Sequence, residues 1–329
     1  MPDLTPLYAT LEAPQAANST PVFAAREIPG YGQHRIAKGA AGEPALLLEV
    51  SDGGGWARPA PIALQNLVVQ HRVECIVQRP SGEEETKRFT VVQCIGSDPD
   101  LQHYFVRIAG VLVEGLGAKP EHGDVARVIN SIVALFHALV RPARKSVQGL
   151  WAELFIIAKS KCPEVLVEAW HSEPEDRYDF SAGASRLEVK SSGSGRQHYF
   201  SHEQAYPPAG AEVVIASLVV DRSTGGTSLG ELLDVVRSKV AGRPELATRV
   251  ETVVAEALGE SLQPALMETF DAEEAVDSLR FYPVASVPRL AEELPPGISE
   301  VRYKADLTGA ALAPTSLMRR FELFRAVAH

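Results

Sequence analysis

The chain has 329 residues, of which 45% are hydrophobic and 22% are charged, and its formal net charge at pH 7 is -10. This composition is typical of a globular protein long enough for two domains, and it excludes the collagen-like and disordered classes. No apolar run reaches the roughly 18 residues that span a bilayer, and the N-terminus lacks a basic-then-apolar signal. We therefore expect a cytoplasmic protein with no membrane association.

The charge is distributed unevenly along the chain. Residues 141–204 contain nine Arg or Lys and nine Asp or Glu residues, so the remainder carries the whole net charge. An acidic body argues against non-specific DNA binding by the whole surface, but it leaves a local basic groove open. Cys75, Cys94 and Cys162 lack the spacing of metal ligands, and we expect reduced core thiols rather than a zinc site.

Residues 1–118 are predicted to form a small β-rich N-terminal domain. A short helix is expected around Leu7–Leu11, and a helical repeat over Asp98–Gly115 closes the unit. The role of this domain is unknown, because it has no clustered His, Cys or Asp residues and Gly53–Gly55 lacks the lysine of a phosphate loop. The predicted strands are Val22–Ile28, His34–Ala37, Ala45–Val50, Asn66–Val77 and Lys87–Ile95.

Residues 119–329 show alternating helical and strand patterns after a linker at Lys119–Gly123. This alternation predicts an α/β (α+β) fold with a mixed central sheet flanked by helices. Glu212–Asp221 is almost continuously apolar, as expected of a strand buried on both faces. The predicted helices are Val125–Val140, Ser146–Ile157, Pro163–Trp170, Ser228–Val240, Glu245–Leu258 and Ser316–Val327, and the other predicted strands are Gln197–Phe200, Leu279–Val287 and Ile298–Leu307. Gln197–Phe200 is expected to be the third strand of the central sheet.

Two short runs in this second domain, Arg177–Phe180 and Arg186–Ser192, predict a β-hairpin. Alternate residues of a strand share a face, so Glu188 and Lys190 point the same way. Antiparallel neighbours lie about 5 Å apart, so the hairpin places Asp179 across from Glu188. Two carboxylates and one ammonium group are therefore expected to converge.

This group suits Mg²⁺, a hard cation that commonly uses one or two carboxylates together with water and substrate phosphate. A neighbouring lysine can pair with the phosphate or hold the attacking water, whose pKa the metal lowers. The alternative is a surface hairpin with a solvated Glu-Lys pair. Asp176 is a second candidate for the metal-binding carboxylate.

Several motifs together resemble the PD-(D/E)xK nuclease superfamily. They are Gly-Leu-x-x-Glu-Leu at 149–154, Ala-Trp at 169–170, Asp-Phe at 179–180 and Glu-Val-Lys-Ser at 188–191. More narrowly, the chain is similar to a bacterial family that is named only for this motif and is often encoded beside restriction and phage-defence genes. The resemblance extends from the first strands to Leu307, and it departs from the motif at Tyr178, where proline would precede the aspartate.

The resemblance implies a restriction-endonuclease-like core and a DNA endonuclease that depends on Mg²⁺, with Mn²⁺ as a substitute. It implies that Asp179, Glu188 and the Val189 carbonyl bind metal, and that Lys190 positions or activates water. Glu153 would bind a second metal ion or orient its water.

Two of the implied site residues have other interpretations. Glu153 lies at the margin of the apolar stripe of the helix Ser146–Ile157, from where it can reach an interior site or remain solvated. Gln204 matches a position where related nucleases often place Gln or Lys near the metal. The alternative is that Gln204 only completes the capping box that begins at Ser201.

Other polar residues near these motifs have less specific patterns. Lys145 follows a helix, where a cation either complements the helix dipole or contacts phosphate. Arg196 and His198 are weak candidates for phosphate contacts, and nothing fixes the geometry of His171. Trp170 is expected to be a core anchor rather than a platform for base stacking.

The acidic body and the unassigned first domain motivate a second hypothesis from a different class. In it, the chain is a nuclease-fold binding or assembly subunit of a defence complex, working with an ATPase, methyltransferase or helicase and having little activity alone. An RNA-cleaving toxin would use the same metal chemistry and stays open. A double-strand cut by one site per chain favours a homodimer.

Overall fold

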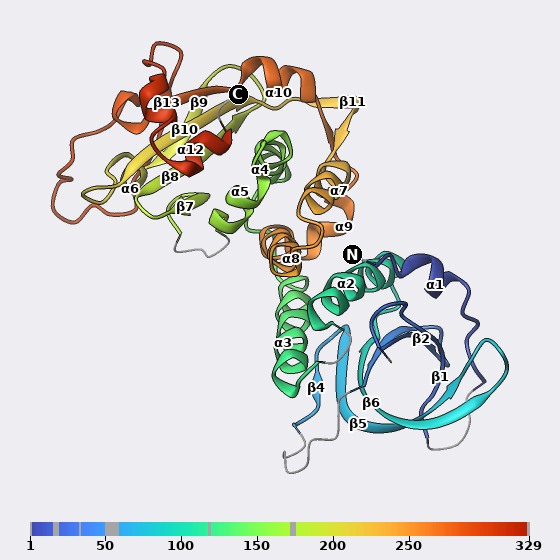
Figure 1. Ribbon diagram of the computed structural model, residues 1–329. Helices are drawn as coiled ribbons and strands as arrows, with labels where there is room; N and C mark the ends of the chain where they lie inside the picture. The colour runs from blue at the N-terminus through green and yellow to red at the C-terminus, as the bar shows by residue number, and fades with distance from the viewer. Residues whose placement is uncertain are drawn as a thin grey trace. The chain divides into compact units, whose positions relative to one another are not determined.

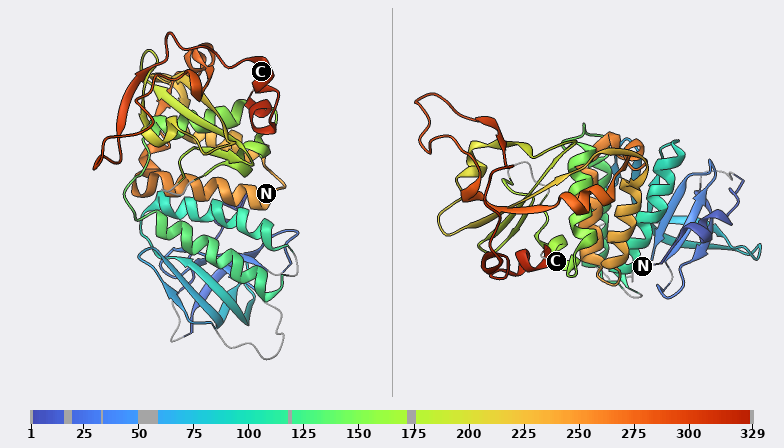
Figure 2. Two further views of the ribbon diagram at one scale, coloured as in Figure 1. Left: turned by 90° about the vertical axis from the view of Figure 1, so that its left-hand side faces the viewer. Right: turned by 90° about the horizontal axis from the view of Figure 1, so that it is seen from above.

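The computed structural model describes residues 2–15, 20–32, 34–49, 59–117, 120–171 and 176–327. The chain forms two compact units, one of Met1–Arg141 with Ala241–Thr252 and one of Pro142–Val240 with Val253–His329. The expected boundary between residues 118 and 119, and the glycine run Gly53–Gly55, lie outside the described residues. Figures 1 and 2 show the helices and strands of each unit.

The first unit contains a closed five-stranded β-barrel, visible in Figure 1. Neighbouring strands are antiparallel, except that the first strand pairs in parallel with the fifth and so closes the barrel. In spatial order the strands are β1 (Val22–Glu27), β2 (Arg35–Gly39), β3 (Pro44–Leu48), β6 (Glu84–Cys94) and β5 (Leu67–Gln78), with the short β4 (Ile62–Ala63) added beside β5. These strands confirm the β-rich first unit expected from the sequence.

Alternating apolar residues of these strands form a common core that includes Phe23, Leu47, Cys75 and Phe89. Cys94 is also buried, whereas Cys162 in the second unit is exposed. The expectation of a core thiol was therefore wrong for Cys162, which directly precedes a helix that begins with proline.

The described helices of the first unit include α1 (Thr5–Ala9), α2 (Pro99–Leu116) and α3 (His122–Ala138), and the unit also contains the first part of α8 (Pro244–Leu258). Helices α2 and α3 pack together, with the rings of Phe105 and Phe136 meeting edge to face at 6.0 Å. The first unit therefore extends past residue 118 and includes α3, whose residues were expected to belong to the second domain.

The second unit is built around a mixed four-stranded sheet, in agreement with the α/β expectation. Its order is β13 (Arg280–Pro283), β10 (Glu212–Val219), β8 (Ser185–Ser192) and β7 (Phe180–Ala182). Strands β8 and β10 are parallel, and the other two pairs are antiparallel. Residues 213–218 of β10 are all buried, which confirms the prediction of a strand covered on both faces.

The predicted third strand of this sheet, β9 (Gln197–Ser201), pairs elsewhere. It forms a two-stranded antiparallel ribbon with β14 (Arg302–Asp306), so the expectation that it extends the sheet was wrong. The physical reason is that both neighbouring positions of β8 are already filled by β7 and β10. The inner face of the ribbon, including Phe200 and Ala305, packs against Ile215 of β10.

Helices surround the sheet. Those that contact its strands include α4 (Val147–Lys159), α5 (Pro163–Ala169), α10 (Ala272–Ser278) and α12 (Glu322–Val327). The other helices and strands are α6 (His202–Ala205), β11 (Arg222–Ser228), α7 (Leu229–Lys239), α8 (Pro244–Leu258), α9 (Leu262–Ala265), β12 (Thr269–Phe270) and α11 (Thr315–Met318), with 3-10 turns at Gly259–Ser261 and Val284–Ser286. The single closing helix expected over Ser316–Val327 is thus two short helices. In the described ranges, no helix is long and apolar enough to cross a membrane.

Helix α4 carries a candidate site residue, and several contacts fix its position. Ser146 caps its start by accepting a hydrogen bond from the Gly149 N–H at 3.1 Å. The Trp151 indole N–H donates to the Thr227 carbonyl at 3.0 Å, and its ring lies 5.5 Å from that of Phe270. The β11–β12 pair therefore holds α4 from its side.

Gly226 allows this β11–β12 pair to form, because a Cβ atom there would lie 2.3 Å from the Phe270 carbonyl oxygen. We expect Gly226→Ala to lower the free energy of unfolding by about 1–3 kcal/mol, since the clash is with backbone that cannot move aside cheaply. The matched control is Gly123→Ala in α3, where a Cβ atom meets nothing within 4 Å. It should leave stability unchanged or raise it by up to about 1 kcal/mol. Equal urea unfolding curves for the two variants would contradict this reading.

Candidate active site

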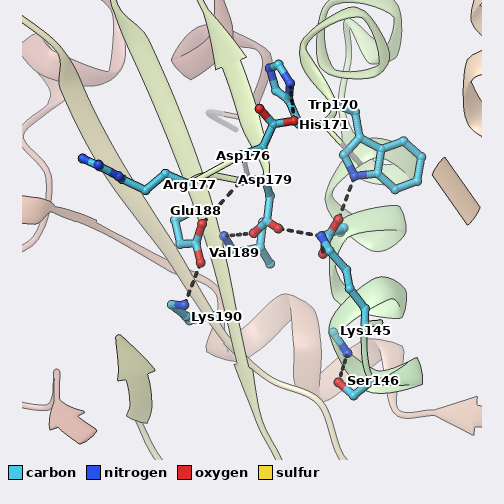
Figure 3. A network of polar contacts seen from close by, with 12 residues as sticks. Lys145, Ser146, Trp170, His171, Asp176, Arg177, Asp179, Glu188, Val189 and Lys190 are labelled. Atoms are coloured by element: carbon cyan, nitrogen blue, oxygen red, sulfur yellow. Dashed lines mark hydrogen bonds and ion pairs between the residues drawn. The ribbon is translucent and has the colours of Figure 1, made fainter. Parts of the chain in front are cut away.

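The β7–β8 hairpin places Asp179 next to Glu188, as the sequence predicted. Phe180 pairs with Leu187, so Asp179 lies directly before β7 and beside Glu188. Its backbone N–H donates to Glu188 Oε2 at 3.3 Å, and its Oδ2 atom accepts from the Val189 N–H at 2.9 Å. Asp179 precedes β7 by one residue, and there its side chain takes the place of a strand backbone by accepting a hydrogen bond from β8. This contact places the carboxylates of Asp179 and Glu188 side by side (Figure 3).

Glu188 and Lys190 lie on the same face of β8 and pair directly. Lys190 Nζ is 2.6 Å from Glu188 Oε1, and both side chains are almost enclosed. Lys190 Nζ also lies 5.1 Å from the centre of the Phe200 ring. The pair is therefore packed between the sheet and the ribbon, which argues against the alternative of a solvated Glu-Lys pair on a surface hairpin.

Gln204 joins this group through both ends of its amide. Its Nε2 atom donates to Glu188 Oε1 at 2.8 Å and to the Arg177 carbonyl at 3.0 Å. Its Oε1 atom accepts from Lys190 Nζ and from the Ser201 N–H, each at 3.2 Å. The predicted capping box is confirmed, and the same side chain also contacts the Glu-Lys pair.

Glu153 points into the interior of the second unit rather than to solvent. Only 3% of the residue is exposed. Its Oε1 atom accepts from Lys145 Nζ at 2.6 Å, and its Oε2 atom accepts from the Trp170 indole N–H at 2.7 Å. Trp170 is fully buried and stacks on Phe180 of β7, so it links α5, the hairpin and Glu153.

The position of Lys145 between two carboxylates was not predicted from the sequence. Its Nζ atom bridges Glu153 Oε1 and Asp179 Oδ1, at 2.6 and 2.7 Å. Figure 3 shows Lys145 reaching Asp179. The backbone N–H groups of Arg144 and Lys145 both donate to the Ala257 carbonyl, which fixes the chain just before α4. No motif spacing marks Lys145, because its position depends on this contact with a distant helix.

These neighbours separate the acidities of the three carboxyl groups. Burial raises the pKa of Glu153 to about 8 and that of Glu188 to about 7, and the charge of Asp179 adds to both effects. Burial also opposes ionisation of Asp179, but Lys145 and the Val189 N–H outweigh it and hold the pKa of Asp179 below its ordinary value. Burial likewise lowers the pKa of Lys145, but Asp179 and Glu153 outweigh it and raise that pKa above its ordinary value.

The oxygen atoms of the hairpin fit one hard divalent cation. A carboxylate offers about four lone-pair sites, and Asp179 uses two of its own for Lys145 and Val189. The Val189 carbonyl lies on the same strand edge as its N–H group. Within the described ranges no group of three His, Cys, Asp or Glu side chains could hold a metal ion, but Mg²⁺ needs only one or two carboxylates when water and phosphate complete its shell. Asp179, Glu188 and Val189 meet that need.

Other candidates lie outside this cluster. Asp176 pairs with His171 at 2.9 Å instead of joining Asp179 and Glu188. Arg196 donates to the carbonyl and hydroxyl oxygens of Ser217 on β10, and His198 is buried with its Nε2 atom 2.8 Å from the same hydroxyl. Burial, with a further contribution from the charge of Lys190, lowers the pKa of His198 to about 4.

The fold and the hairpin cluster define a mixed α/β protein with an Asp, then Glu-x-Lys arrangement. Residues 4–308 match the model of the family described as "Putative PD-(D/E)XK family member, (DUF4420)". The chain belongs to this family, which confirms the resemblance inferred from its motifs. No curated protein and no solved structure matches the chain.

The raised pKa values predict how stability depends on pH. Between pH 4.5, the ordinary pKa of these groups, and about 8, Glu153 and Glu188 bind more protons in the folded chain than in the unfolded chain. The free energy of unfolding should therefore fall as pH rises through this window. The lowered pKa of Asp179 acts below this window, where stability falls with falling pH.

Glu188→Gln should reduce the fall in stability across this window by about 1–3 kcal/mol, because it removes one of the two carboxyl groups responsible. The measurement is urea unfolding at several pH values without divalent ions. The exposed Glu293 supplies the control variant, Glu293→Gln, which should follow the parent curve. A Glu188→Gln curve parallel to that of the parent would refute the assignment.

Proposed function

We propose that this protein is a Mg²⁺-dependent DNA endonuclease with a restriction-endonuclease-like core in its second unit. We further propose that it acts in the cytoplasm within a restriction or phage-defence system. One observation carries the proposal: Asp179 and Glu188 are aligned across one hairpin, with Lys190 2.6 Å from Glu188 on the same strand face. Two enclosed carboxylates held together raise each other's cost of ionisation, and a divalent cation removes that cost. Membership of the PD-(D/E)XK family supports the same conclusion.

In this proposal the residues of the hairpin have different roles in metal binding and catalysis. Asp179, Glu188 and the Val189 carbonyl would hold the ion, which when bound would lower the pKa of a water molecule and offset charge on the phosphate. Lys190 positions the attacking water or contacts the phosphate. Gln204 fixes both Lys190 and Glu188 through the two ends of its amide.

Glu153 has a supporting role in this proposal. Its two oxygen atoms are engaged by Lys145 and Trp170, so it holds Lys145 against Asp179. This is a different role from the two that the resemblance implied, which were binding a second metal ion and orienting its water. The contact orients the Asp179 carboxylate toward the hairpin.

The β9–β14 ribbon supports the choice of a nucleic acid as substrate. Its outer face carries Tyr199, which is 68% exposed, together with the exposed Arg302 and Lys304. Lys304 Nζ lies 5.8 Å from the centre of the Tyr199 ring. Aromatic rings that stack on bases, flanked by cations that contact phosphates, are the usual means of binding single-stranded nucleic acid. Phe200 is the next residue of the same strand and points to its opposite face, where its ring centre lies 5.1 Å from Lys190 Nζ, so the ribbon links this outer face to the proposed site.

The second hypothesis is a nuclease-fold subunit that binds or assembles with an ATPase, methyltransferase or helicase. The net charge of -10 favours it, since an acidic protein binds DNA weakly without a basic partner. A homodimer, which would supply two sites for a double-strand cut, belongs to the first hypothesis. The two hypotheses differ in whether the purified chain cuts DNA.

Asp179→Ala, Glu188→Ala and Lys190→Ala should each reduce cleavage by on the order of 100-fold or more, because the first two remove proposed metal ligands and the third removes the group proposed to act on the water or phosphate. The measurement is cleavage of methylated and unmethylated plasmid DNA with Mg²⁺, Mn²⁺ or EDTA. Lys161→Ala, at an exposed position in the same unit, is the matched control and should cut like the parent. Metal-independent cutting, or full activity of Asp179→Ala, would overturn the proposal. Folded parent protein that cuts nothing would favour the assembly subunit.

The ribbon makes a separate prediction about binding. Tyr199→Ala should weaken binding of a labelled single-stranded DNA by about 1–3 kcal/mol, the usual contribution of one base stacked on an aromatic ring. Lys304→Ala should lower the slope of log affinity against log salt by about one unit. Both are measured by fluorescence anisotropy in EDTA, with Lys161→Ala as control. Unchanged affinity in both variants would remove the ribbon from the proposed binding surface.

A further inference from the structure

Lys145 lies between two carboxylates of the site without being part of the Asp, Glu-x-Lys motif. Its Nζ atom is 2.6 Å from Glu153 Oε1 and 2.7 Å from Asp179 Oδ1. The Glu153 and Asp179 side chains are 4% and 14% exposed, and that of Lys145 is 30% exposed. A single cation therefore bridges two nearly enclosed carboxylates.

The surroundings hold this bridge in place from three directions. Trp170 engages the other oxygen atom of Glu153, and the Val189 N–H engages the other oxygen atom of Asp179. The backbone N–H of Lys145 is fixed to the Ala257 carbonyl at 3.1 Å. Each carboxylate consequently turns one oxygen atom toward the same point, and the ammonium group occupies that point.

An ammonium group and a divalent cation compete for such a position. Both satisfy carboxylate oxygen atoms, but an ammonium group has three donors and no lone pair, so it cannot share the position as a metal ligand. The cluster contains three carboxylates and two ammonium groups, Lys145 and Lys190, which leaves one negative charge when all are ionised. One bound divalent ion would bring the net charge of the cluster to +1, whereas two would bring it to +3, so the charges favour one ion over two.

We propose that Lys145 takes the place of a second metal ion in this site. The ammonium group neutralises Glu153 and Asp179, keeps Glu153 from coordinating metal, and limits each chain to one divalent ion at Asp179 and Glu188. This inference rests on the proposed function in taking Asp179 and Glu188 as the metal-binding pair. Lys145 is thus a positioning residue that determines the number of ions the site takes.

The test counts bound Mn²⁺ by the electron paramagnetic resonance signal of the free ion, using the full chain without DNA. The parent should bind one ion per chain, and Lys145→Met should bind two, because Glu153 and Asp179 then face an unfilled position. Lys145→Met with Glu153→Gln should return to one ion. Lys159→Met is the matched control, since Lys159 is an exposed lysine on α4. It should bind one ion like the parent.

A parent chain that binds two ions, or a Lys145→Met chain that binds Mn²⁺ with the parent's stoichiometry and affinity, would overturn the inference. Lys145→Met leaves two carboxylates without their cation, so its folding is followed separately by its melting temperature. Mn²⁺ should raise the melting temperature of Lys145→Met more than that of Lys159→Met, and an equal rise would count against the proposal. If the parent binds no ion while Lys145→Met binds one, the metal role of Asp179 and Glu188 fails but the role of Lys145 stands.

Discussion

The rest of the site depends on the two hydrogen bonds that the Asp179 carboxylate accepts. One of its oxygen atoms bonds the Val189 N–H on β8, and the other pairs with Lys145 before α4. Through these two bonds, Asp179 joins the hairpin group of Glu188, Lys190 and Gln204 to the Lys145–Glu153 pair. Burial of the cluster raises the pKa of Glu153 and of Glu188, whereas the charge of Lys145 lowers the pKa of Asp179 and keeps it ionised.

The fold explains why these groups can be held together despite like charges. Strand β8 has β7 and β10 on its two sides, so the hairpin is built into the sheet rather than exposed at the surface. The β9–β14 ribbon covers the face of Glu188, and Gln204 follows directly from that ribbon. Helix α4 brings Glu153 from a separate segment, held by Trp151 and Trp170. Each charged group therefore has its hydrogen-bond partners, as buried charges require.

Local patterns in the sequence predicted the parts of the site that depend on neighbouring residues. Period-two alternation placed Glu188 and Lys190 on one face, and capping patterns located the starts of α4 and α6. The barrel strands were also predicted to within a few residues. Features that depend on contacts between distant residues were not predicted. Strand β9 was predicted as a strand, but its pairing with β14 was not. The position of Lys145 depends on a hydrogen bond to Ala257 of α8. Strand β11, with Gly225 and Gly226, has too little strand propensity to be predicted locally.

We propose that Asp179, Glu188 and the Val189 carbonyl form a site for one divalent cation. The most direct test is a crystal grown with Mn²⁺ and measured at a wavelength where manganese scatters anomalously. We expect a single anomalous peak beside Asp179 and Glu188, with the Lys145 ammonium group still between Asp179 and Glu153. A peak between Glu153 and Asp179 with Lys145 displaced, or no peak at the hairpin in crystals that contain Mn²⁺, would contradict it.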